Sequence, residues 1–321
     1  MNAKHLIENH PLYPQLITHF KFDELLAPHT SFKIGGKAEV FYLPKSVNEL
    51  ETMCNFFIRE GIELSIIGNA SNLLISDDGL KGVVIQMSDF LPPSIIKSEN
   101  DDVLVVAQAG TLIETFLQFC IANELSGLED FGGLPASIGG AAFMNAKCFE
   151  TSISDVLVSA EVMKVQANNI AISEYKMKKD DWAYKHSPFQ ECQSGIRLKE
   201  GREVVLSCVL KLKKGKREEI QKKIQEKKDG RRIKKQFDFP SAGSVFKNDY
   251  SIGIPTGKLV SDAGLLGLQC GAAQVAFWHG NFIINLGGAT SNDVLELMTR
   301  VKQEIKTKYG ILLESEIIYC E

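Results

Sequence analysis

The sequence predicts a globular protein of mixed α and β structure with two or three domains. Hydrophobic residues make up 44% and charged residues 24% of the 321 residues, the ordinary range for a chain that buries a sizeable core. Segments with helical periodicity and capping signals are interspersed with short apolar segments typical of strands. Loops rich in small residues follow several of these segments.

The first well-defined helix is expected in "KSVNELETMCNFFIREG". Ser46 and Glu49 have the spacing of a capping box, the apolar residues share one face, and Gly61 is expected to end the helix. The segments "ELSIIG", "NLLIS" and "GVVIQM" then predict short strands, with a loop of small residues from 68 to 71.

A second run of elements starts near Val103. The segment "VLVVAQAG" predicts a strand, and Thr111 with Glu114 is expected to cap the helix "LIETFLQFCIANE" before Gly127. Five glycines follow within "GLEDFGGLPASIGGAAFMNA", a density that argues against ordinary helix or strand. The segments "SAEVMKVQ" and "EVVLSCVLKL" predict further sheet.

Twelve Lys and Arg residues lie between residues 213 and 235, interleaved with glutamates. Ile220 and Ile224 form an i, i+4 apolar pair, which predicts an exposed amphipathic helix that runs into the basic tip "RRIKK". A last helix is expected in "SNDVLELMTRVKQEIKTKYG", ended by Gly310, followed by a final strand in "ILLESEIIYC". The apolar stripe of that helix consists of Val294, Leu297, Met298, Val301 and Ile305.

Charge and cysteine content exclude several classes of protein. Lys and Arg total 36 against 40 Asp and Glu, a net charge of −4, so no global field attracts nucleic acid or a membrane surface. The start lacks a signal-peptide pattern, and no apolar run approaches the roughly 18 residues of a membrane span. Seven scattered cysteines without a C-x-x-C pair argue against disulfides and structural metal. We expect a cytoplasmic monomer without nucleic-acid, membrane or metal partners.

Two loops are candidates for holding phosphate, "IIGNASNLLIS" and "GGLPASIGG", although taken alone each is more often a tight turn under a helix. The chain lacks both G-x-G-x-x-G and G-x-x-x-x-G-K-[ST], which disfavours the Rossmann and P-loop folds. In "FPSAGSVFKN", Ala and Gly precede Ser244, so a ligand could approach its hydroxyl closely. The alternative there is also a simple turn.

Seven motifs stand in this order along the chain: "HTSFKIGGKAEVFYLP", "IIGNASNLLISDDGLKGVVI", "GLEDFGGLPASIGGAAFMNA", "WAYKHSPF", "FPSAGSVFKN", "HGNFIIN" and "LLESEI". Together they resemble the UDP-N-acetylenolpyruvoylglucosamine reductase family, flavoenzymes of bacterial peptidoglycan synthesis. The resemblance implies an α+β fold: a two-subdomain FAD-binding unit of the vanillyl-alcohol oxidase type, in residues 1–88 and 89–213, plus a C-terminal α+β substrate-binding domain. That last domain, residues 214–321, would return its final strand to the active site.

The resemblance also implies an FAD site made by both loops. The residues that would wrap the pyrophosphate are Gly68, Asn69, Ala70, Ser71 and Asn72. Those that would pack against the dinucleotide and flavin are Gly133, Leu134, Ser137, Gly139 and Gly140. The family has glycine at the positions of Ala70 and Ala136, so close approach there is expected to be strained and not blocked.

The implied reaction takes a hydride from NADPH through FAD to C3 of UDP-N-acetylglucosamine enolpyruvate, with a proton delivered to C2. Ser244 matches the family's proton donor. Glu316 matches its acidic residue and is preferred to Glu314 because it directly precedes the family's apolar pair. The implied substrate contacts are Tyr184, Arg232, Lys247, Asn248 and His279. For His279, a structural role is an equal alternative.

The main departure from the family is Lys185, where the family has the arginine that stabilises the substrate carboxylate and enolate. Lysine keeps the charge and loses the planar bidentate fork. Three outcomes are open: Lys185 substitutes, another cation such as Arg197 or Arg232 takes over, or activity is lowered. We favour Lys185 as the catalytic cation.

Three other functions remain alternatives. One is another FAD-dependent oxidoreductase of the same superfamily, disfavoured by the motifs of the third domain. Another is a nucleotide- or nucleic-acid-binding module built on residues 211–235, which lacks interleaved aromatic residues. A non-catalytic homologue would be expected to have lost Ser244 or Glu316. The short interval between "HSPF" and "FPSAGS" indicates the subtype without a long capping loop.

Overall fold

The computed structural model describes residues 3–88, 90–167, 169–190 and 195–321. The contacts group the chain into two compact units. The first consists of Met1–Asp23, Glu39–Asn69 and Lys81–Gly230, and the second of Glu24–Ala38, Ala70–Leu80 and Arg231–Glu321. The boundaries expected after residues 88 and 213 stay predictions.

Helices and strands are mixed throughout, as the predicted α+β class requires. The α-helices are α1 (Ala3–Glu8), α2 (Tyr13–Leu16), α3 (Val47–Arg59), α4 (Ile113–Ala122), α5 (Ile138–Phe143), α6 (Arg217–Ile233), α7 (Thr256–Asp262) and α8 (Ser291–Tyr309). The strands are β1 (Phe20–Leu25), β2 (Lys37–Tyr42), β3 (Leu64–Ile67), β4 (Leu73–Ile75), β5 (Leu80–Gln86), β6 (Ser94–Glu99), β7 (Asp102–Gln108), β8 (Leu125–Ser126), β9 (Lys147–Cys148), β10 (Thr151–Ser152), β11 (Leu157–Val165), β12 (Ile170–Lys176), β13 (Glu203–Lys214), β14 (Ser241–Ser244), β15 (Gln269–Cys270), β16 (Ala273–Val275), β17 (Phe282–Asn285) and β18 (Ile318–Cys320).

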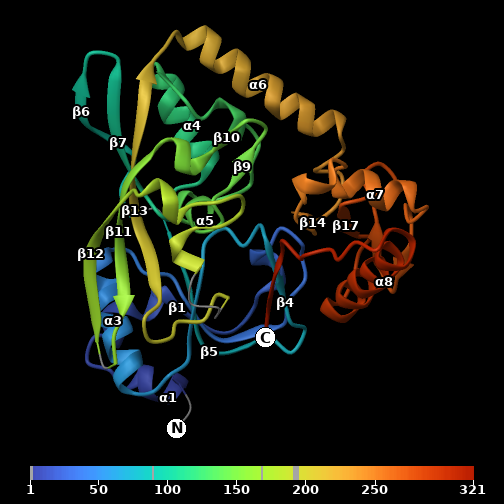
Figure 1. Ribbon diagram of the computed structural model, residues 1–321. Helices are drawn as coiled ribbons and strands as arrows, with labels where there is room; N and C mark the ends of the chain where they lie inside the picture. The colour runs from blue at the N-terminus through green and yellow to red at the C-terminus, as the bar shows by residue number, and fades with distance from the viewer. Residues whose placement is uncertain (1–2, 89, 168, 191–194) are drawn as a thin grey trace. The chain divides into compact units, whose positions relative to one another are not determined.

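The first unit contains two larger sheets, the two-stranded antiparallel pair β9–β10, and helices packed beside them (Figure 1). One sheet has the strand order β1-β2-β5-β3, with β3 and β5 parallel. The other is antiparallel with the order β12-β11-β13-β7-β6, and β8 pairs with β13 at one end. Helix α5 packs against β7 and β13. The strands predicted from apolar segments in this region are confirmed.

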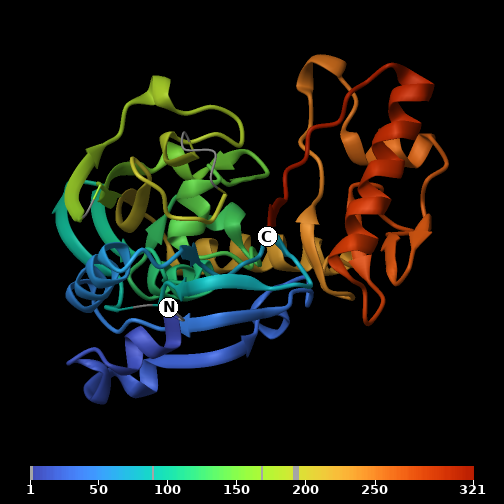
Figure 2. The same ribbon diagram turned by 90° about the horizontal axis from the view of Figure 1, so that it is seen from below.

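The second unit contains helices α7 and α8 and a small sheet with the order β14-β17-β16-β15. Helix α8, red in Figure 2, contacts β15, β16 and α7. All five residues of its predicted stripe are buried, and Gly310 ends it in the left-handed region at φ 71°. The predicted final strand is shorter than expected, because only Ile318–Cys320 pairs with β4, in parallel. No described helix is both long and apolar enough to cross a membrane.

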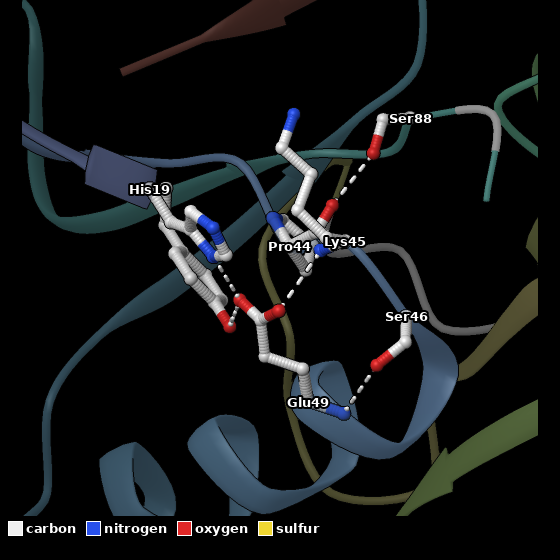
Figure 3. Close-up of polar contacts among 7 residues, drawn as sticks. His19, Pro44, Lys45, Ser46, Glu49 and Ser88 are labelled. Carbon is white, nitrogen blue, oxygen red and sulfur yellow. Dashed lines mark hydrogen bonds and ion pairs between the residues drawn. The ribbon is translucent and has the colours of Figure 1, made fainter. Parts of the chain in front are cut away.

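Helix α3 begins at the predicted N-cap, but the capping box is only half formed (Figure 3). The Ser46 hydroxyl accepts a hydrogen bond from the Glu49 N–H at 3.1 Å. The Glu49 carboxylate accepts instead from the N–H of Lys45 at 3.1 Å and from the Tyr42 hydroxyl at 2.8 Å, and lies 2.7 Å from His19 Nδ1. The Glu49 carboxylate, which the sequence spacing assigned to the capping box, is thus bound by residues of other elements.

The predicted cap of α4 is wrong. The N-cap residue is Leu112, which makes no side-chain capping bond, and the helix ends at Ala122. The N–H of Ile113 donates to the Ala136 carbonyl at 2.9 Å, so the glycine-rich loop satisfies a helix end that local sequence was expected to satisfy.

The glycine-dense segment is also more regular than predicted, because Gly139 and Gly140 lie inside α5. Glycine is required at position 139 for packing: a Cβ there would lie 2.6 Å from Ala109 Cβ. Close packing therefore explains Gly139, which the density of glycines had predicted to lie outside regular structure.

Helix α6 has the predicted amphipathic character, with Ile220 and Ile224 buried. Several of its cations form ion pairs, including Lys227 with Asp130 at 2.8 Å and Lys228 with Glu114 at 2.6 Å. These cations neutralise acidic groups of the same unit, which weakens the case for a nucleic-acid surface on this helix.

Candidate active site

The loop after β3 leaves its backbone donors available. In the described residues, no backbone acceptor is bound by the N–H groups of Gly68, Asn69, Ala70 or Ser71. Consecutive free N–H groups after a strand are the feature that binds phosphate oxygens. A Cβ on Gly68 would lie 2.4 Å from Ser137 Oγ, so a larger residue there would force the Ser137 hydroxyl out of its capping position.

The second glycine-rich segment uses only part of its backbone donors internally, because the N–H groups of Gly133, Ala136 and Ser137 have no backbone acceptor among the described residues. The N–H of Ile138 donates to Thr111 O and that of Gly139 to Ala109 O, each at 2.8 Å. Ser137 is the N-cap of α5, and its hydroxyl accepts from Gly140 N–H at 3.3 Å. Asn69 Nδ2 donates to the Pro135 carbonyl at 2.9 Å and so ties the two loops together.

These loops fit FAD. The first offers unbound N–H groups and a glycine that admits close approach, which suits a pyrophosphate. The second is anchored by the hydrogen bonds of Ile138 and Gly139 to carbonyls of residues 111 and 109, which suits a packing surface for the rest of the dinucleotide. The individual contacts expected for Gly133, Leu134 and Gly140 stay predictions.

The two alanines that depart from the family pattern differ in backbone conformation. Ala70 has φ 45°, in the left-handed region where an L-residue is strained, whereas Ala136 is not among the residues with positive φ. Only the first of the two positions therefore gains conformationally from glycine.

Ser244 ends strand β14 directly after a β-bulge. Ser241 pairs with Ile284 and Ser244 with Phe282, so two residues of β14 intervene against one of β17. Gly243 within the bulge has φ 75°. The bulge turns the strand locally and sets the direction of the Ser244 side chain. Its hydroxyl has no hydrogen-bond partner among the residues that the structure describes.

The C-terminal segment brings Glu316 beside Ser244. Glu316 N–H donates to the carbonyl of Val245 at 2.7 Å, and Lys247 N–H donates to the carbonyl of Glu314 at 2.9 Å. The Glu316 residue is buried, whereas the Glu314 side chain is 71% exposed and lies 2.6 Å from Lys247 Nζ. The two glutamates therefore occupy different environments although they are two residues apart.

Asn72 links the loop after β3 to the C-terminal segment that carries Glu316. Its Nδ2 donates to the Glu316 carbonyl at 3.0 Å, and its own carbonyl accepts from Ile318 N–H at 3.0 Å. Ser31, for which the sequence suggested no role, donates from its hydroxyl to the Ser241 carbonyl at 2.8 Å. The sequence signal that could have indicated a role for Ser31 was its position in the "HTSF" motif. Both residues tie predicted site segments together within the second unit.

Two of the predicted substrate contacts already have internal partners. Asn248 Oδ1 accepts from Thr256 N–H at 2.9 Å, and Lys247 is the cation paired with Glu314. Asn281, missed by sequence reasoning, is buried and fixes the peptide of Phe246, accepting from its N–H at 2.9 Å and donating to its carbonyl at 2.8 Å. The segment directly after Ser244 is thus anchored by two hydrogen bonds to one side chain.

His279 has structural contacts in the same unit. Its Nδ1 accepts from Asn281 N–H at 3.2 Å, and its ring meets Phe282 edge-on with centroids 4.7 Å apart. Burial, and next the positive charge of Lys234, lower the pKa of His279 below its usual value. The ring is therefore neutral at pH 7, and its two contacts favour the structural alternative.

Tyr184 and Lys185 form the tip of a tight turn in the first unit. Ala183 and His186 exchange backbone hydrogen bonds of 3.2 and 3.0 Å, and Lys185 has φ 55°. A non-glycine residue at positive φ is uncommon and is found often at functional sites. Arg197, one of the alternative cations, lies 3.6 Å from Glu63. Arg232 lies in the last turn of α6.

The cysteines behave as core residues. Those at positions 54, 120, 148, 208 and 320 are buried, and Cys270 is half-buried. Burial raises the pKa of the Cys54 thiol, which keeps it protonated and unreactive. Cys192 lies outside the described residues. Within the described ranges, no group of three or more His, Cys, Asp or Glu residues could hold a metal ion.

Comparison with known proteins identifies two matching domains. The FAD binding domain matches residues 38–169, and the C-terminal domain of UDP-N-acetylenolpyruvoylglucosamine reductase matches residues 235–320. The UDP-N-acetylenolpyruvoylglucosamine reductase of Treponema denticola is 42% identical over 319 residues, which cover 99% of this chain and 98% of that protein. The reductase of Borreliella burgdorferi is 36% identical over 294 residues, with 92% of each chain covered.

The solved structures give the same result. The crystal structure of UDP-N-acetylenolpyruvylglucosamine reductase from Thermus caldophilus matches with a TM-score of 0.72 and 30% identity, covering 93% of this chain and 98% of that one. The predicted fold class, with an FAD-binding unit followed by a C-terminal domain, is confirmed. The chain is an oxidoreductase and belongs to the UDP-N-acetylenolpyruvoylglucosamine reductase family.

Proposed function

We propose that this chain uses FAD and NADPH to reduce UDP-N-acetylglucosamine enolpyruvate to UDP-N-acetylmuramate in peptidoglycan precursor synthesis. Family membership and the FAD-binding domain support the reaction class. The observation that carries the proposal is the hydrogen bond from Glu316 N–H to the carbonyl of Val245, which sets the acidic residue beside Ser244. The proposal keeps the cytoplasmic location and monomeric state expected from the sequence.

Side chains of the protein would stabilise the negative charge that develops on the substrate and would supply the proton. When bound, FAD would pass a hydride from NADPH to C3 of the enolpyruvyl group. Negative charge then develops at C2 beside the carboxylate, and the protein must stabilise it and supply a proton. Ser244, whose hydroxyl is not engaged by the described residues, would donate the proton to C2. Glu316 would polarise the enolate from its buried position.

Lys185 would supply the positive charge near the substrate carboxylate, in place of the family's arginine. Its position at the tip of a two-residue turn with φ 55° supports this role, because strained residues gather at functional sites. Arg197 is the weaker alternative because Glu63 is its neighbour. Arg232 and Tyr184, together with Lys247 Nζ, Asn248 Nδ2 and His279 Nε2, remain proposed contacts for the substrate.

The test separates the two halves of the reaction. The purified protein is expected to be yellow, to bleach with NADPH under anaerobic conditions, and to regain colour when UDP-N-acetylglucosamine enolpyruvate is added. A protein that takes up no FAD would contradict the cofactor assignment. A protein that NADPH bleaches but the enolpyruvyl substrate does not reoxidise would contradict the proposed substrate and leave the fold intact.

Substitution of Lys185 tests the departure from the family. Lys185→Ala is expected to slow flavin reoxidation about 100-fold, the usual effect of losing one group that stabilises an oxyanion. Lys185→Arg should retain most of the rate, and reduction by NADPH should be unaffected in both. Arg197→Ala is the control. If Arg197→Ala slows reoxidation and Lys185→Ala does not, the catalytic cation is Arg197.

A further inference from the structure

We propose that Asn145 is a positioning residue that holds the Tyr184 and Lys185 turn in its working conformation. This inference rests on the proposed function for its kinetic consequence. Asn145 follows α5, is 4% exposed, and donates from Nδ2 to the carbonyl of Ala183 at 2.7 Å. That same carbonyl accepts from His186 N–H at 3.0 Å and closes the turn. The asparagine therefore binds the atom that defines the turn.

The end of α5 has the backbone geometry of a Schellman motif. Asn145 has φ 40°, its N–H donates to Ala142 O at 3.1 Å, and Ala146 N–H donates to Ala141 O at 2.8 Å. Glycine suits this left-handed position better than any other residue. Ending the helix therefore requires no side chain at position 145.

The Asn145 side chain instead buries an unsatisfied acceptor, which is unfavourable, and its hydrogen bond to the turn is the contact that offsets this. Asn145 Oδ1 is buried and has no hydrogen-bond partner in the described part of the chain. An unsatisfied buried acceptor is unfavourable. Rotating the amide would place Oδ1 against the Ala183 carbonyl, so the orientation is fixed by the bond that Nδ2 makes.

Two further bonds from the same helix end support the segment after the turn. The Phe143 carbonyl accepts from Ser187 Oγ at 2.6 Å and from Gln190 Nε2 at 2.7 Å. The ring of Phe143 lies 5.2 Å from the guanidinium of Arg202. The end of α5 thus holds residues 183–190 at several points, and Asn145 is the one that contacts the turn itself.

The consequence is kinetic and specific to one half-reaction. A small displacement of a catalytic group can cost up to about 100-fold in rate, so Asn145→Gly is expected to slow substrate-dependent flavin reoxidation by about tenfold. Reduction of the flavin by NADPH should stay within about twofold of wild type. Asn145→Asp, which places an acceptor against the Ala183 carbonyl, should be slower still.

Asn100→Gly is the matched control, because Asn100 is also left-handed, with φ 53°, and is exposed in the turn between β6 and β7. Hydrogen exchange of the holoenzyme gives a readout that needs no activity. We expect faster exchange in the peptide covering residues 183–190 in Asn145→Gly and no change there in Asn100→Gly. Unchanged exchange in Asn145→Gly would overturn the inference whatever reaction the enzyme catalyses.

A double-mutant cycle tests whether Asn145 acts through the turn's cation. In the Lys185→Ala background, Asn145→Gly should change reoxidation less than twofold, because the positioned group is gone. An undiminished tenfold effect in that background would show that Asn145 acts elsewhere. If wild type itself fails to reoxidise with the enolpyruvyl substrate, the proposed function fails, and hydrogen exchange still decides the positioning role.

Discussion

The two glycine-rich segments assigned to FAD differ in how many of their backbone donors are already bound. From Gly68 to Ser71, the backbone N–H groups have no backbone acceptor in the described residues, whereas Ile138 and Gly139 in the other loop donate to neighbouring carbonyls. Similar composition therefore serves two purposes. The consecutive unbound donors of the first segment can bind an anion, whereas the second segment, anchored where α5 begins, is a surface whose glycines allow close packing.

The largest effect on stability is expected from adding a methyl group at Gly139, where α5 packs closely. Gly139→Ala would place a Cβ 2.6 Å from Ala109 Cβ and should lower the free energy of unfolding by about 1–3 kcal/mol through overpacking. Gly140→Ala, the adjacent control, would meet only Ser137 Oγ at 3.3 Å and should stay within about 1 kcal/mol of wild type, because alanine favours helix. Urea unfolding measures both, and equal effects would mean that packing does not select glycine at position 139.

The next effect compares the two alanines. Ala70→Gly should raise the free energy of unfolding by about 0.5–1 kcal/mol, because relief of left-handed strain exceeds the added chain entropy. Ala136→Gly should lower it by about 0.5–1 kcal/mol, since that residue has no such strain to relieve. Thermal unfolding of the FAD-free proteins checks the signs. Destabilisation by both substitutions would contradict the strain assigned to Ala70.

A smaller effect on stability is expected where the loops are joined. Asn69→Ala removes the bond to the Pro135 carbonyl and should cost about 0.5–1 kcal/mol in unfolding free energy. Its main consequence should be a several-fold weaker Kd for FAD, because the loop with unbound donors loses its anchor. Titration of the FAD-free protein with FAD measures this. Unchanged affinity would show that the anchor is unnecessary.

The smallest effect is expected in the second unit and concerns how its stability depends on pH. There the Ser244 hydroxyl has no partner among the described residues, whereas the His279 ring accepts a hydrogen bond within the unit. Because the folded-state pKa of His279 lies below its ordinary value of 6.5, the unfolded chain binds more protons between the two pKa values. The contribution of His279 to stability is therefore complete above about pH 6.5 and is lost as pH falls through the folded-state pKa.

His279→Asn keeps an acceptor for Asn281 N–H and removes the titrating group. The loss of stability between pH 7.5 and pH 5, measured by urea unfolding, should be smaller in this variant than in wild type. An identical pH dependence in the two proteins would show that His279 titrates alike in the folded and unfolded states.

Local periodicity predicted the regular elements well and their ends less well. The apolar stripe and the terminal glycine of α8 were readable because both lie in one continuous segment. The cap expected at Thr111 was wrong because the Ala136 carbonyl receives the N–H of Ile113, and the second half of the Ser46 capping box was lost to a tertiary cluster around Glu49. Helix ends depend on partners that sequence spacing does not reveal.

By itself, the sequence determined the mixed fold class, the α8 stripe, the basic helix α6 and, through motif order, the family. The bulge before Ser244, the left-handed backbone of Ala70 and Lys185, and the hydrogen bonds of Asn145 and Asn72 became visible only in the folded chain. Asn145 binds a carbonyl 38 residues away, and Asn72 binds one 244 residues away. Periodicity reports which residues share a face within one element, whereas a hydrogen bond between distant segments exists only once both are folded and packed.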